Sequence, residues 1–534
     1  MNKSIRYFAL VTTILLLIYG FWPLYSDEYQ ITFDQEKTKQ KESFIENASS
    51  SNENPPNIVL IVADDLGKTD ISFYGNKNVN TKHIDGIAHS GISFDEAYVS
   101  SAVCSPSRAG LMTGRYQQRF GYEFQIHEIY PVNRLQLYGW KYFVKSRPWF
   151  VRLAESVPTK EDMFKQGLPP SEVTLAEVLK KIGYNTAIIG KWHLGTANYS
   201  LPTNRGFDYH YGFYSSHSLY APEGTKGIVN QKINEDWTDS YIWKGQRKGN
   251  CAIYMNHEEI EDTVYLTDRI ADESIQFIED NKNDPFFLYV PFSAPHTPLQ
   301  VPEDIYRKYS NIKDPYERIY FAMIESLDDA IGKILGKLEK EGLTENTIVY
   351  FISDNGGATY THTTNNGHLK GGKITNFEGG LKVPFFMKWP AKIPAASVYK
   401  KPVISLDIFT TSIAQAGISN FDKLDLDGKD LMAIIADPSS SIHDALYWKA
   451  GFNRAIRSGN WKLIMDEKHD HTLLYNIKAD ESETNNLSGE YAQVVAELNE
   501  QHEKWQQSLK AAKWPPVIYF SYLDDDGTRY YYEN

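Results

Sequence analysis

A cysteine followed by a proline and an arginine is the first feature of this chain that could do chemistry. The segment Cys104-Ser-Pro-Ser-Arg108 is followed by Thr113-Gly-Arg115. Pro106 suits the first turn of a helix, so we expect Cys104 just before a helix N-terminus, where free N–H groups bind anions. Arg108 adds a positive charge one turn further on. The pattern indicates either a nucleophile beside an anion site or a buried structural thiol, which is common for a lone cysteine.

Other polar clusters come at or just past the ends of apolar runs. They contain the oxygen ligands Asp64, Asp65, Asp354 and Asn355, and the basic or imidazole side chains Lys191, His193 and His296. Carboxylate and amide oxygens suit Ca²⁺ or Mg²⁺ and not a soft metal. An isolated Asp-Asp or Asp-Asn pair has a second ordinary explanation, since both pairs also serve as helix caps or turns.

The elements that position these clusters alternate between strands and helices. Continuous apolar runs typical of strands buried on both faces occupy 57–63, 186–189, 286–290, 347–352 and 383–387. Thr174 and Glu177 predict a capping box at the start of one helix, and a second helix is expected over 316–341. This alternation predicts an α/β fold with a largely parallel sheet, whose ligands bind beyond the carboxyl ends of the strands.

The character of the chain changes after about residue 440. Short strands with tight turns are expected over 455–464 and 472–475, and a helix over 491–511. The sequence therefore predicts a smaller α+β subdomain. The divisions we expect are a targeting segment at 1–26, a polar linker at 27–54, a catalytic domain at 55–440 and a C-terminal subdomain with a tail at 441–534.

The cysteine motif resembles the signature of the type I sulfatases, which are formylglycine-dependent, arylsulfatase-like enzymes of the alkaline phosphatase-like superfamily. Further segments similar to that family occur in the expected order: Asp64-Asp-Leu-Gly67, Gly190-Lys-Trp-His-Leu-Gly195, Pro295-His-Thr-Pro298, Ser353-Asp-Asn-Gly-Gly357, Gly372-Lys373, Glu378-Gly-Gly380, Asn460-Trp-Lys-Leu-Ile464, Leu474-Tyr-Asn476 and Glu483-Thr-Asn-Asn-Leu487. The resemblance covers about residues 55 to 510 and implies a bacterial carbohydrate sulfatase. It also implies an α/β/α sandwich with a large mixed, mostly parallel sheet and an antiparallel sheet in the C-terminal subdomain.

The resemblance implies a role for each matching residue. A separate maturation enzyme oxidises Cys104 to formylglycine, whose hydrate attacks the sulfur of a sulfuric ester. One Ca²⁺, with Mg²⁺ as the alternative, is held by Asp64, Asp65, modified Cys104, Asp354 and Asn355. Arg108 and Lys191 hold the nucleophile and the sulfate, His193 deprotonates the second hydroxyl, and His296 and Lys373 contact the sulfate and assist protonation of the leaving group. Two positions depart from the family pattern, namely Lys382 in place of the usual arginine and Lys68 where an aromatic side chain is common.

The N-terminus is expected to target the chain for export. Lys3 and Arg6 precede an apolar run from Phe8 to Trp22, the pattern of a secretory signal. The run approaches the ~20 residues that span a bilayer, and no small-x-small cleavage site follows it. We therefore expect a periplasmic or secreted protein. Removal of the segment and retention as a membrane anchor are both open.

Composition limits the partners and the redox chemistry. The 55 basic and 68 acidic residues give a net charge of −13, which argues against a nucleic-acid partner. The chain has two cysteines, Cys104 and Cys251, too few for a disulfide scaffold or a cysteine-rich metal site. If Cys104 is modified, Cys251 has no intrachain partner, so no disulfide is expected.

An apparent insertion at 123–165 bears on the substrate. Its aromatic and arginine side chains suit sugar rings and sulfate groups; they are Tyr130, Arg134, Tyr138, Trp140, Tyr142, Arg147, Trp149 and Arg152. On weaker grounds, His217 and the stretch 241–247 are expected on the same rim. A packed accessory helix pair is an equally good explanation of the insertion. We favour a sulfated poly- or oligosaccharide as substrate, with three alternatives: a small-molecule arylsulfatase, a phosphatase or phosphodiesterase, and a non-enzymatic glycan-binding homologue.

Overall fold

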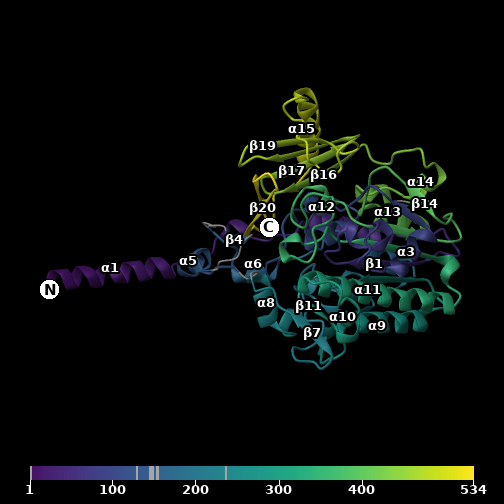
Figure 1. Cartoon of the computed structure of the whole chain (residues 1–534), viewed down its shortest axis with the longest axis horizontal. Coiled ribbons are helices and arrows are strands. Elements are labelled where there is room, and N and C mark those ends of the chain that lie inside the picture. The colour runs from purple at the N-terminus through teal and green to yellow at the C-terminus, as the bar shows by residue number, and fades with distance from the viewer. Residues whose placement is uncertain are drawn as a thin grey trace.

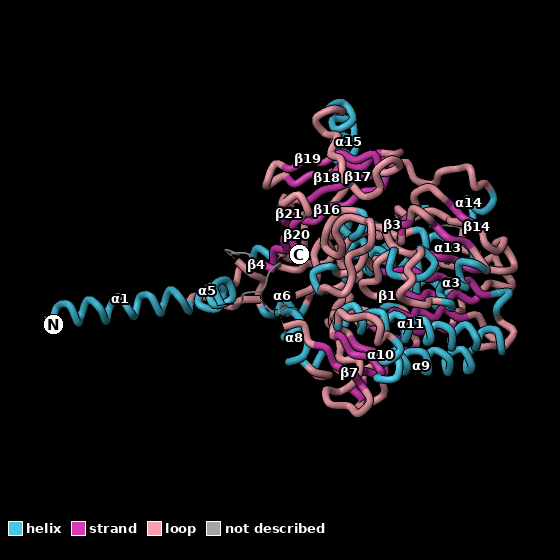
Figure 2. Tube along the Cα trace, in the orientation of Figure 1, coloured by secondary structure: helices cyan, strands magenta, loops and turns pink. Residues whose placement is uncertain are grey.

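A ten-stranded sheet forms the centre of the computed structural model, which describes residues 3–127, 130–143, 149–151, 156–234, 237–419, 421–516 and 518–534 (Figures 1 and 2). In spatial order its strands are β14 (Ser397–Tyr399), β2 (Ile92–Phe94), β13 (Phe385–Lys388), β12 (Thr347–Ser353), β1 (Asn57–Ala63), β10 (Phe286–Pro291), β5 (Asn185–Lys191), β6 (Tyr209–Phe213), β8 (Ile253–Met255) and β9 (Glu258–Ile260). The five strands from β12 to β6 are parallel, whereas β13 and β8 flank them in antiparallel pairing. The predicted mixed, mostly parallel sheet is confirmed.

Alternate side chains of β1 enter two separate cores, one on each face of the sheet. Ile58, Leu60 and Val62 pack with α4 (Cys104–Thr113), α7 (Leu175–Lys181) and α13 (Asp407–Gln415). Val59 and Ile61 pack with α3 (Lys82–His89), α9 (Leu266–Asn281) and α11 (Pro315–Lys340). Because both faces are covered, the central strands are apolar throughout, and the predicted α/β/α sandwich is confirmed.

The ends of two helices follow the sequence signals closely. Thr174 and Glu177 form the predicted capping box of α7, each side chain bonding the backbone N–H of the other residue. Asp314 caps α11, which ends one residue before the predicted boundary. The other helices and strands of the large domain and its insertion are α5 (Arg134–Phe143), α6 (Lys160–Phe164), α8 (Trp237–Gly245), α10 (Glu303–Lys308), α12 (Glu378–Leu381), α14 (Met432–Ala436), β3 (Ala97–Tyr98), β7 (Ile228–Gln231), β11 (Leu299–Pro302) and β15 (Val403–Ile404).

The C-terminal part contains a second sheet. Four antiparallel strands, β16 (Ala445–Ala450), β17 (Asn453–Ser458), β18 (Trp461–Asp466) and β19 (His471–Asn476), are covered by α15 (Ala492–Gln506). The predicted short strands and the following helix are therefore present. Of the last two strands, β20 (Ile518–Leu523) pairs with β21 (Arg529–Glu533) on one side and with β4 (Trp149–Val151) on the other, so the end of the chain builds a small sheet with the insertion.

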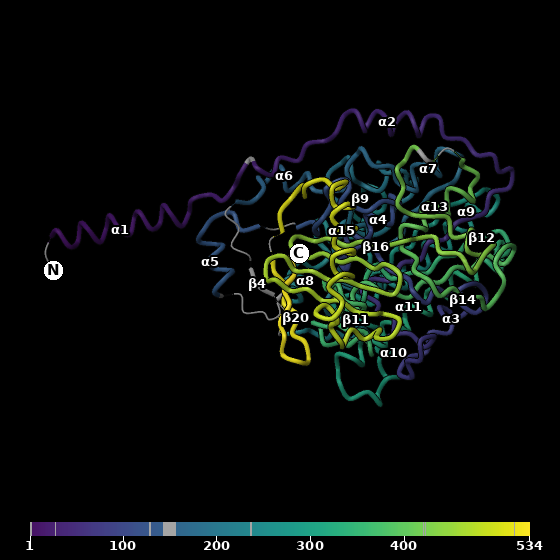
Figure 3. The backbone as a smooth tube through the Cα atoms, turned by 90° about the horizontal axis from the view of Figure 1, so that it is seen from above, coloured from purple at the N-terminus to yellow at the C-terminus, as the bar shows by residue number. Residues whose placement is uncertain are grey.

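The N-terminal region contains two helices with different surroundings. α1 (Lys3–Phe21) projects away from the globular body with no buried residue (Figures 1 and 3). α2 (Gln35–Glu46), within the segment expected as a flexible linker, instead lies along the body beside α7 (Figure 3). Asp34 caps the helix, and two long-range contacts hold it on the body, namely the packing of Phe44 on the main core and the 2.6 Å ion pair between Lys41 and Glu177.

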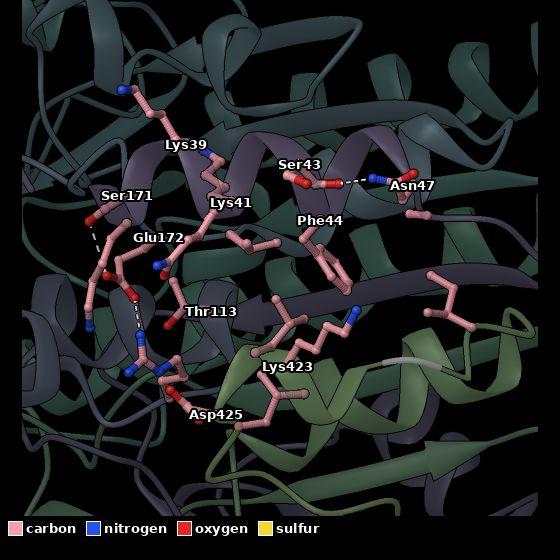
Figure 4. Close-up of a pocket in the computed structure, with 18 of the residues that line it drawn as sticks. Lys39, Lys41, Ser43, Phe44, Asn47, Thr113, Ser171, Glu172, Lys423 and Asp425 are labelled. Carbon is pink, nitrogen blue, oxygen red and sulfur yellow. Dashed lines mark hydrogen bonds and ion pairs between the residues drawn. The ribbon is translucent and has the colours of Figure 1, made fainter. Parts of the chain in front are cut away.

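A cavity of about 640 Å³ lies beneath α2, and Lys41 and Phe44 point toward it (Figure 4). Lys423 and Asp425 line it from the opposite side. None of the predicted catalytic or metal-binding residues is among the described residues that line this cavity.

Candidate active site

The carboxyl ends of neighbouring strands bring the predicted oxygen ligands together. β1 and β12 are paired in register with Ala63 opposite Ser353, so the residues that follow them leave the sheet side by side. The Asp65 backbone N–H donates to Asp354 Oδ1 at 3.2 Å. The Asn355 amide donates to Asp65 Oδ1 at 2.8 Å. Strand order, and not sequence proximity, therefore builds the acidic cluster.

Cys104 is the first residue of α4, one position further into the helix than the sequence indicated. Its Sγ lies 3.3 Å from Asp64 Oδ1 and 3.5 Å from Asp65 Oδ1. Burial and the charge of Asp354 raise the pKa of the Cys104 thiol well above its usual value. An unmodified thiol here stays protonated and is therefore a weak nucleophile.

Three buried cations pair with the three carboxylates of the cluster. The shortest contacts are Lys191 Nζ to Asp64 Oδ2 at 2.6 Å, Arg108 Nε to Asp354 Oδ2 at 2.8 Å and Lys373 Nζ to Asp65 Oδ2 at 2.9 Å. Burial alone would raise the pKa of Asp64 and Asp65, but the surrounding positive groups together outweigh it and hold both pKa values below the usual range, with Lys191 the largest of them at Asp64 and Lys373 at Asp65. Burial and Asp64 raise the pKa of Asp354.

The donor set fits a hard divalent cation. Asn355 Oδ1 is buried and accepts no hydrogen bond from any described residue, whereas its Nδ2 is fully used. A buried amide oxygen without a donor is costly unless another positive group meets it. With the carboxylates of Asp64, Asp65 and Asp354 beside it, this oxygen suits Ca²⁺ or Mg²⁺.

The two predicted histidines differ in their surroundings. Neither ring nitrogen of His193 is hydrogen-bonded to a described residue. Burial and the nearby Lys191 charge hold the pKa of His193 well below its usual value, so the ring is neutral and can accept a proton. His296 Nε2 lies 3.6 Å from Asp65 Oδ2, and its Nδ1 lies 2.5 Å from the carbonyl oxygen of Thr297. Because a carbonyl only accepts, Nδ1 carries the proton.

A cavity of about 440 Å³ opens above Cys104, His193, His296 and Lys373. Its walls come from distant parts of the chain and combine the aromatic side chains Trp140, Tyr214, Tyr241 and Tyr360 with the polar side chains Gln125, His127, Ser215, Ser216, His217, Thr238, Ser240, Lys244 and Asn534. The expectation that His217 and part of 241–247 line the rim is confirmed. Gln125, Tyr214, Tyr360 and Asn534 were not singled out, since nothing in their spacing marks residues that meet only through loops.

Most of the insertion residues named from the sequence lie elsewhere. Trp140 is the one that lines the cavity among those that the structure describes. Tyr130 is buried and accepts from Gln166 at 2.7 Å, Arg134 lies 4.7 Å from the ring of Tyr19, and Tyr138 and Tyr142 are exposed. Arg147, Arg152 and the side chain of Trp149 lie outside the described residues.

Lys382 and Lys68, which depart from the family pattern, are held by contacts within the protein. The same is true of Arg247, which was expected on the rim. Lys382 forms a 2.6 Å ion pair with Glu481, and Lys68 donates to the carbonyl oxygen of Asp95. Arg247 donates to the carbonyl oxygens of residues 219 and 220. None of the three is among the described residues that line the catalytic cavity.

An anionic ester is the substrate that this arrangement suits, because Arg108, Lys191 and Lys373 gather at the start of α4 and at the carboxyl ends of parallel strands, and Cys104 and Lys373 line an open cavity there. Fold and site together define a hydrolase with an alkaline phosphatase-like architecture. A family model described as sulfatase matches residues 56–418, and one described as N-sulphoglucosamine sulphohydrolase, C-terminal, matches residues 372–508. The chain belongs to the sulfatase family and is a sulfuric ester hydrolase.

Individual relatives agree with this assignment. The arylsulfatase of Hemicentrotus pulcherrimus is 32% identical over 419 residues, covering 76% of this chain and 67% of the relative. The N-acetylgalactosamine-6-sulfatase of Rattus norvegicus is 31% identical over 413 residues, covering 76% of this chain and 71% of the relative. Among solved structures, Ps i-CgsB in complex with k-i-k-neocarrahexaose has a TM-score of 0.72 and 30% identity, covering 86% of this chain and 94% of that one.

Proposed function

We propose that this enzyme removes sulfate from a sulfated poly- or oligosaccharide, using a formylglycine derived from Cys104 and one divalent cation, Ca²⁺ or alternatively Mg²⁺. The observation that carries the proposal is the lining of the catalytic cavity. Aromatic rings stack on the faces of sugars, and amides, hydroxyls and imidazoles bind their hydroxyl groups. The structural relative that binds a carrageenan oligosaccharide supports the same substrate class.

Asp64, Asp65, Asp354, Asn355 and the modified residue 104 would hold the cation. When present, formylglycine supplies an oxygen nucleophile as its hydrate, and the cation supplies positive charge that favours the ionised form of that oxygen. The high pKa of the unmodified thiol accords with a need for this conversion by a separate maturation enzyme.

The remaining site residues bind the sulfate and move protons. Arg108, Lys191 and Lys373 are each held by an ion pair to a buried carboxylate, so they can face developing negative charge without reorganisation. His193, neutral and without a described partner, accepts the proton of the second hydroxyl. His296 and Lys373, which line the cavity beside Cys104, contact the sulfate. They assist protonation of the leaving oxygen, Lys373 through its ammonium group and His296 through Nε2 when that atom is protonated, since its Nδ1–H is held by the Thr297 carbonyl.

The N-terminal segment supports the proposed location of the enzyme outside the cytoplasm. α1 carries two basic residues in its first turn and is apolar beyond them, which supports export to the periplasm or the exterior. Both cysteines are buried and neither forms a disulfide in the structure, so stability in an oxidising compartment comes from the two large cores and the bound cation.

The test is a comparison of esters with the matured full-length enzyme. We expect sulfate release, followed by ion chromatography, to give a higher kcat/KM for a sulfated saccharide than for nitrophenyl sulfate, and no comparable turnover of nitrophenyl phosphate. A preference for the aryl sulfate refutes the saccharide proposal and selects the small-molecule arylsulfatase. A preference for the phosphate ester selects the phosphatase, and no turnover of any ester by protein with confirmed formylglycine selects a glycan-binding role.

A variant of the cavity wall separates sugar recognition from chemistry. Replacing Tyr241 by alanine removes one aromatic wall of the cavity, which packs against the ring of His217. We expect kcat/KM for the saccharide to fall about tenfold while that for nitrophenyl sulfate changes little. Tyr491, an exposed tyrosine on the C-terminal subdomain, is the matched control for the same substitution.

A further inference from the structure

The apolar helix α1 is joined to the globular body by a short, ordered segment and not by a flexible linker. The Leu24 N–H donates to the carbonyl oxygen of Val132 at 3.2 Å, and the Val157 N–H donates to that of Leu24 at 2.8 Å. Leu24 is buried in a small core with Tyr130, Leu137 and Val157. Cleavage just after residue 26 would remove a segment that is built into the fold, so the structure favours retention of α1.

The surface of α1 suits lipid. Among the described residues it is the one helix long and apolar enough to cross a membrane, and all its side chains are accessible. The hydroxyls of Thr12 and Thr13 donate to the carbonyl oxygens of Phe8 and Ala9 at 2.8 Å. No polar group of these threonines is left without a partner, which is what a hydrocarbon environment requires.

The helix α5 lies beside the body-proximal end of α1 (Figure 1). The Arg134 guanidinium lies 4.7 Å from the Tyr19 ring, Tyr138 is hydrogen-bonded to Tyr19, and a Cβ placed on Gly20 would lie 3.6 Å from Leu135 Cβ. α5 therefore begins at the level where the apolar segment ends. In a bilayer this level is the interface between hydrocarbon and water.

α5 is two-faced. Leu137 is buried and Trp140 lines the catalytic cavity, so this side of the helix contacts the protein. Leu135, Tyr138 and Tyr142 recur at a spacing of three and four residues and are 53%, 39% and 61% exposed. This exposed stripe continues from the exposed aromatic end of α1, and Arg134 and Lys141 are the basic residues of the helix.

We propose that α1 and the exposed stripe of α5 form one membrane-contacting surface, with α1 spanning a lipid bilayer and α5 lying at its interface. Tyrosine, tryptophan and basic side chains are the residues enriched at that depth, and the basic residues at the start of α1 place its N-terminus on the cytoplasmic side. Because Trp140 belongs to the same helix, this arrangement places one wall of the catalytic cavity next to the membrane interface. α8, which also lines the cavity, lies on the side from which α1 projects (Figure 1).

The depth of α5 can be measured in the full-length matured protein reconstituted into phosphatidylethanolamine–phosphatidylglycerol nanodiscs. Leu135→Cys and Tyr142→Cys carry a nitroxide, and Val398→Cys on β14, where Val398 is 49% exposed, is the matched control. Cys251 is buried and does not compete for the label. On transfer from detergent to nanodiscs, we expect accessibility to a nickel chelate to fall severalfold relative to oxygen at residues 135 and 142, and to stay unchanged at residue 398. Equal accessibility at all three positions overturns the proposal.

A second measurement needs no variant. The intact mass of the protein extracted from host membranes is expected to include α1. A mature chain that begins beyond residue 21 overturns the proposal. Neither readout involves sulfate release, so its failure leaves the proposed sulfatase activity unaffected.

Discussion

Replacing Lys462 by methionine is expected to destabilise the contact between the C-terminal sheet and the large domain by about 3–5 kcal/mol. Lys462 lies on β18 and is fully buried. Its Nζ forms ion pairs with Glu378 Oε1 at 2.8 Å and Glu483 Oε1 at 2.9 Å, and both carboxylates are also fully buried. Methionine keeps most of the side-chain volume but leaves two buried carboxylates facing each other, so the cost is mainly that of uncompensated charge.

The stability lost in Lys462→Met should depend on pH. Burial, only partly offset by Lys462, raises the pKa of Glu483 to about 7 in the folded protein, against 4.5 without the fold. A folded-state pKa above the unfolded one gives stability that is present at low pH and is lost as pH rises through the folded pKa. Removing Lys462 raises the pKa of Glu483 further. The deficit of Lys462→Met is therefore expected to be smaller at about pH 5 than at about pH 8.

Urea denaturation at both pH values, followed by fluorescence, measures the effect. Lys333→Met is the matched control, because Lys333 forms an exposed ion pair with Asp268 and its loss should cost less than about 1 kcal/mol. Adding Glu483→Gln to Lys462→Met removes one uncompensated charge and should recover part of the stability. A cost for Lys462→Met no greater than the control, or no recovery in the double variant, refutes the reasoning.

Four further outcomes are expected. Cys104→Ala should reduce sulfate release to background, with retention of the melting transition as the check on folding. His193→Gln should lower kcat by about 10²–10⁴ with little change in KM, as measured by steady-state kinetics. Chelation should lower Tm and added Ca²⁺ should restore it, because Ca²⁺ at a hundredfold excess over Kd stabilises the folded state by about 2.7 kcal/mol. In the same calorimetric titration, the Tm of Asn355→Leu should not respond to Ca²⁺. Burial lowers the pKa of His502 to about 4 from 6.5, so its stabilising effect is lost as pH falls through that window. His502→Gln, whose amide can still donate to Trp448 O, should flatten the fall of Tm between those pH values.

The central strands and the polar residues at their ends were predictable because a strand buried on both faces must be apolar along its whole length. The runs 57–63 and 347–352 show this, and each ends where a polar cluster begins. The direction of a strand was not predictable in the same way. β13 is as apolar as its neighbour β12 but pairs with it in the antiparallel sense, and an apolar run has the same composition in either direction.

The cavity walls were much less predictable than its floor. Trp140, Tyr360 and Asn534 come from three segments far apart in the sequence. β4 of the insertion pairs with β20 near the end of the chain, and Tyr360 packs against Phe520 of β20. Such pairings depend on backbone hydrogen bonds between short strands, which leave no periodic signal in the side chains. α2 is a comparable case, since Phe44 packs against the main core and Lys41 pairs with Glu177, and two such contacts are too few to give its polar sequence an apolar period.

The family-like segments to which no chemistry was assigned have a structural role in a buried ion cluster. Glu378, Lys462 and Glu483 come from three separate motifs, and they meet where the C-terminal sheet contacts α12. Behind Glu378, a Cβ on Gly380 would lie 2.2 Å from the carbonyl oxygen of Thr375, so glycine is required for α12 to lie against the loop that carries Lys373. The C-terminal sheet therefore supports the position of a site lysine through α12, although it contributes none of the residues around the carboxylate cluster. Family motifs in this chain thus include residues that meet the substrate and residues that hold those residues in place.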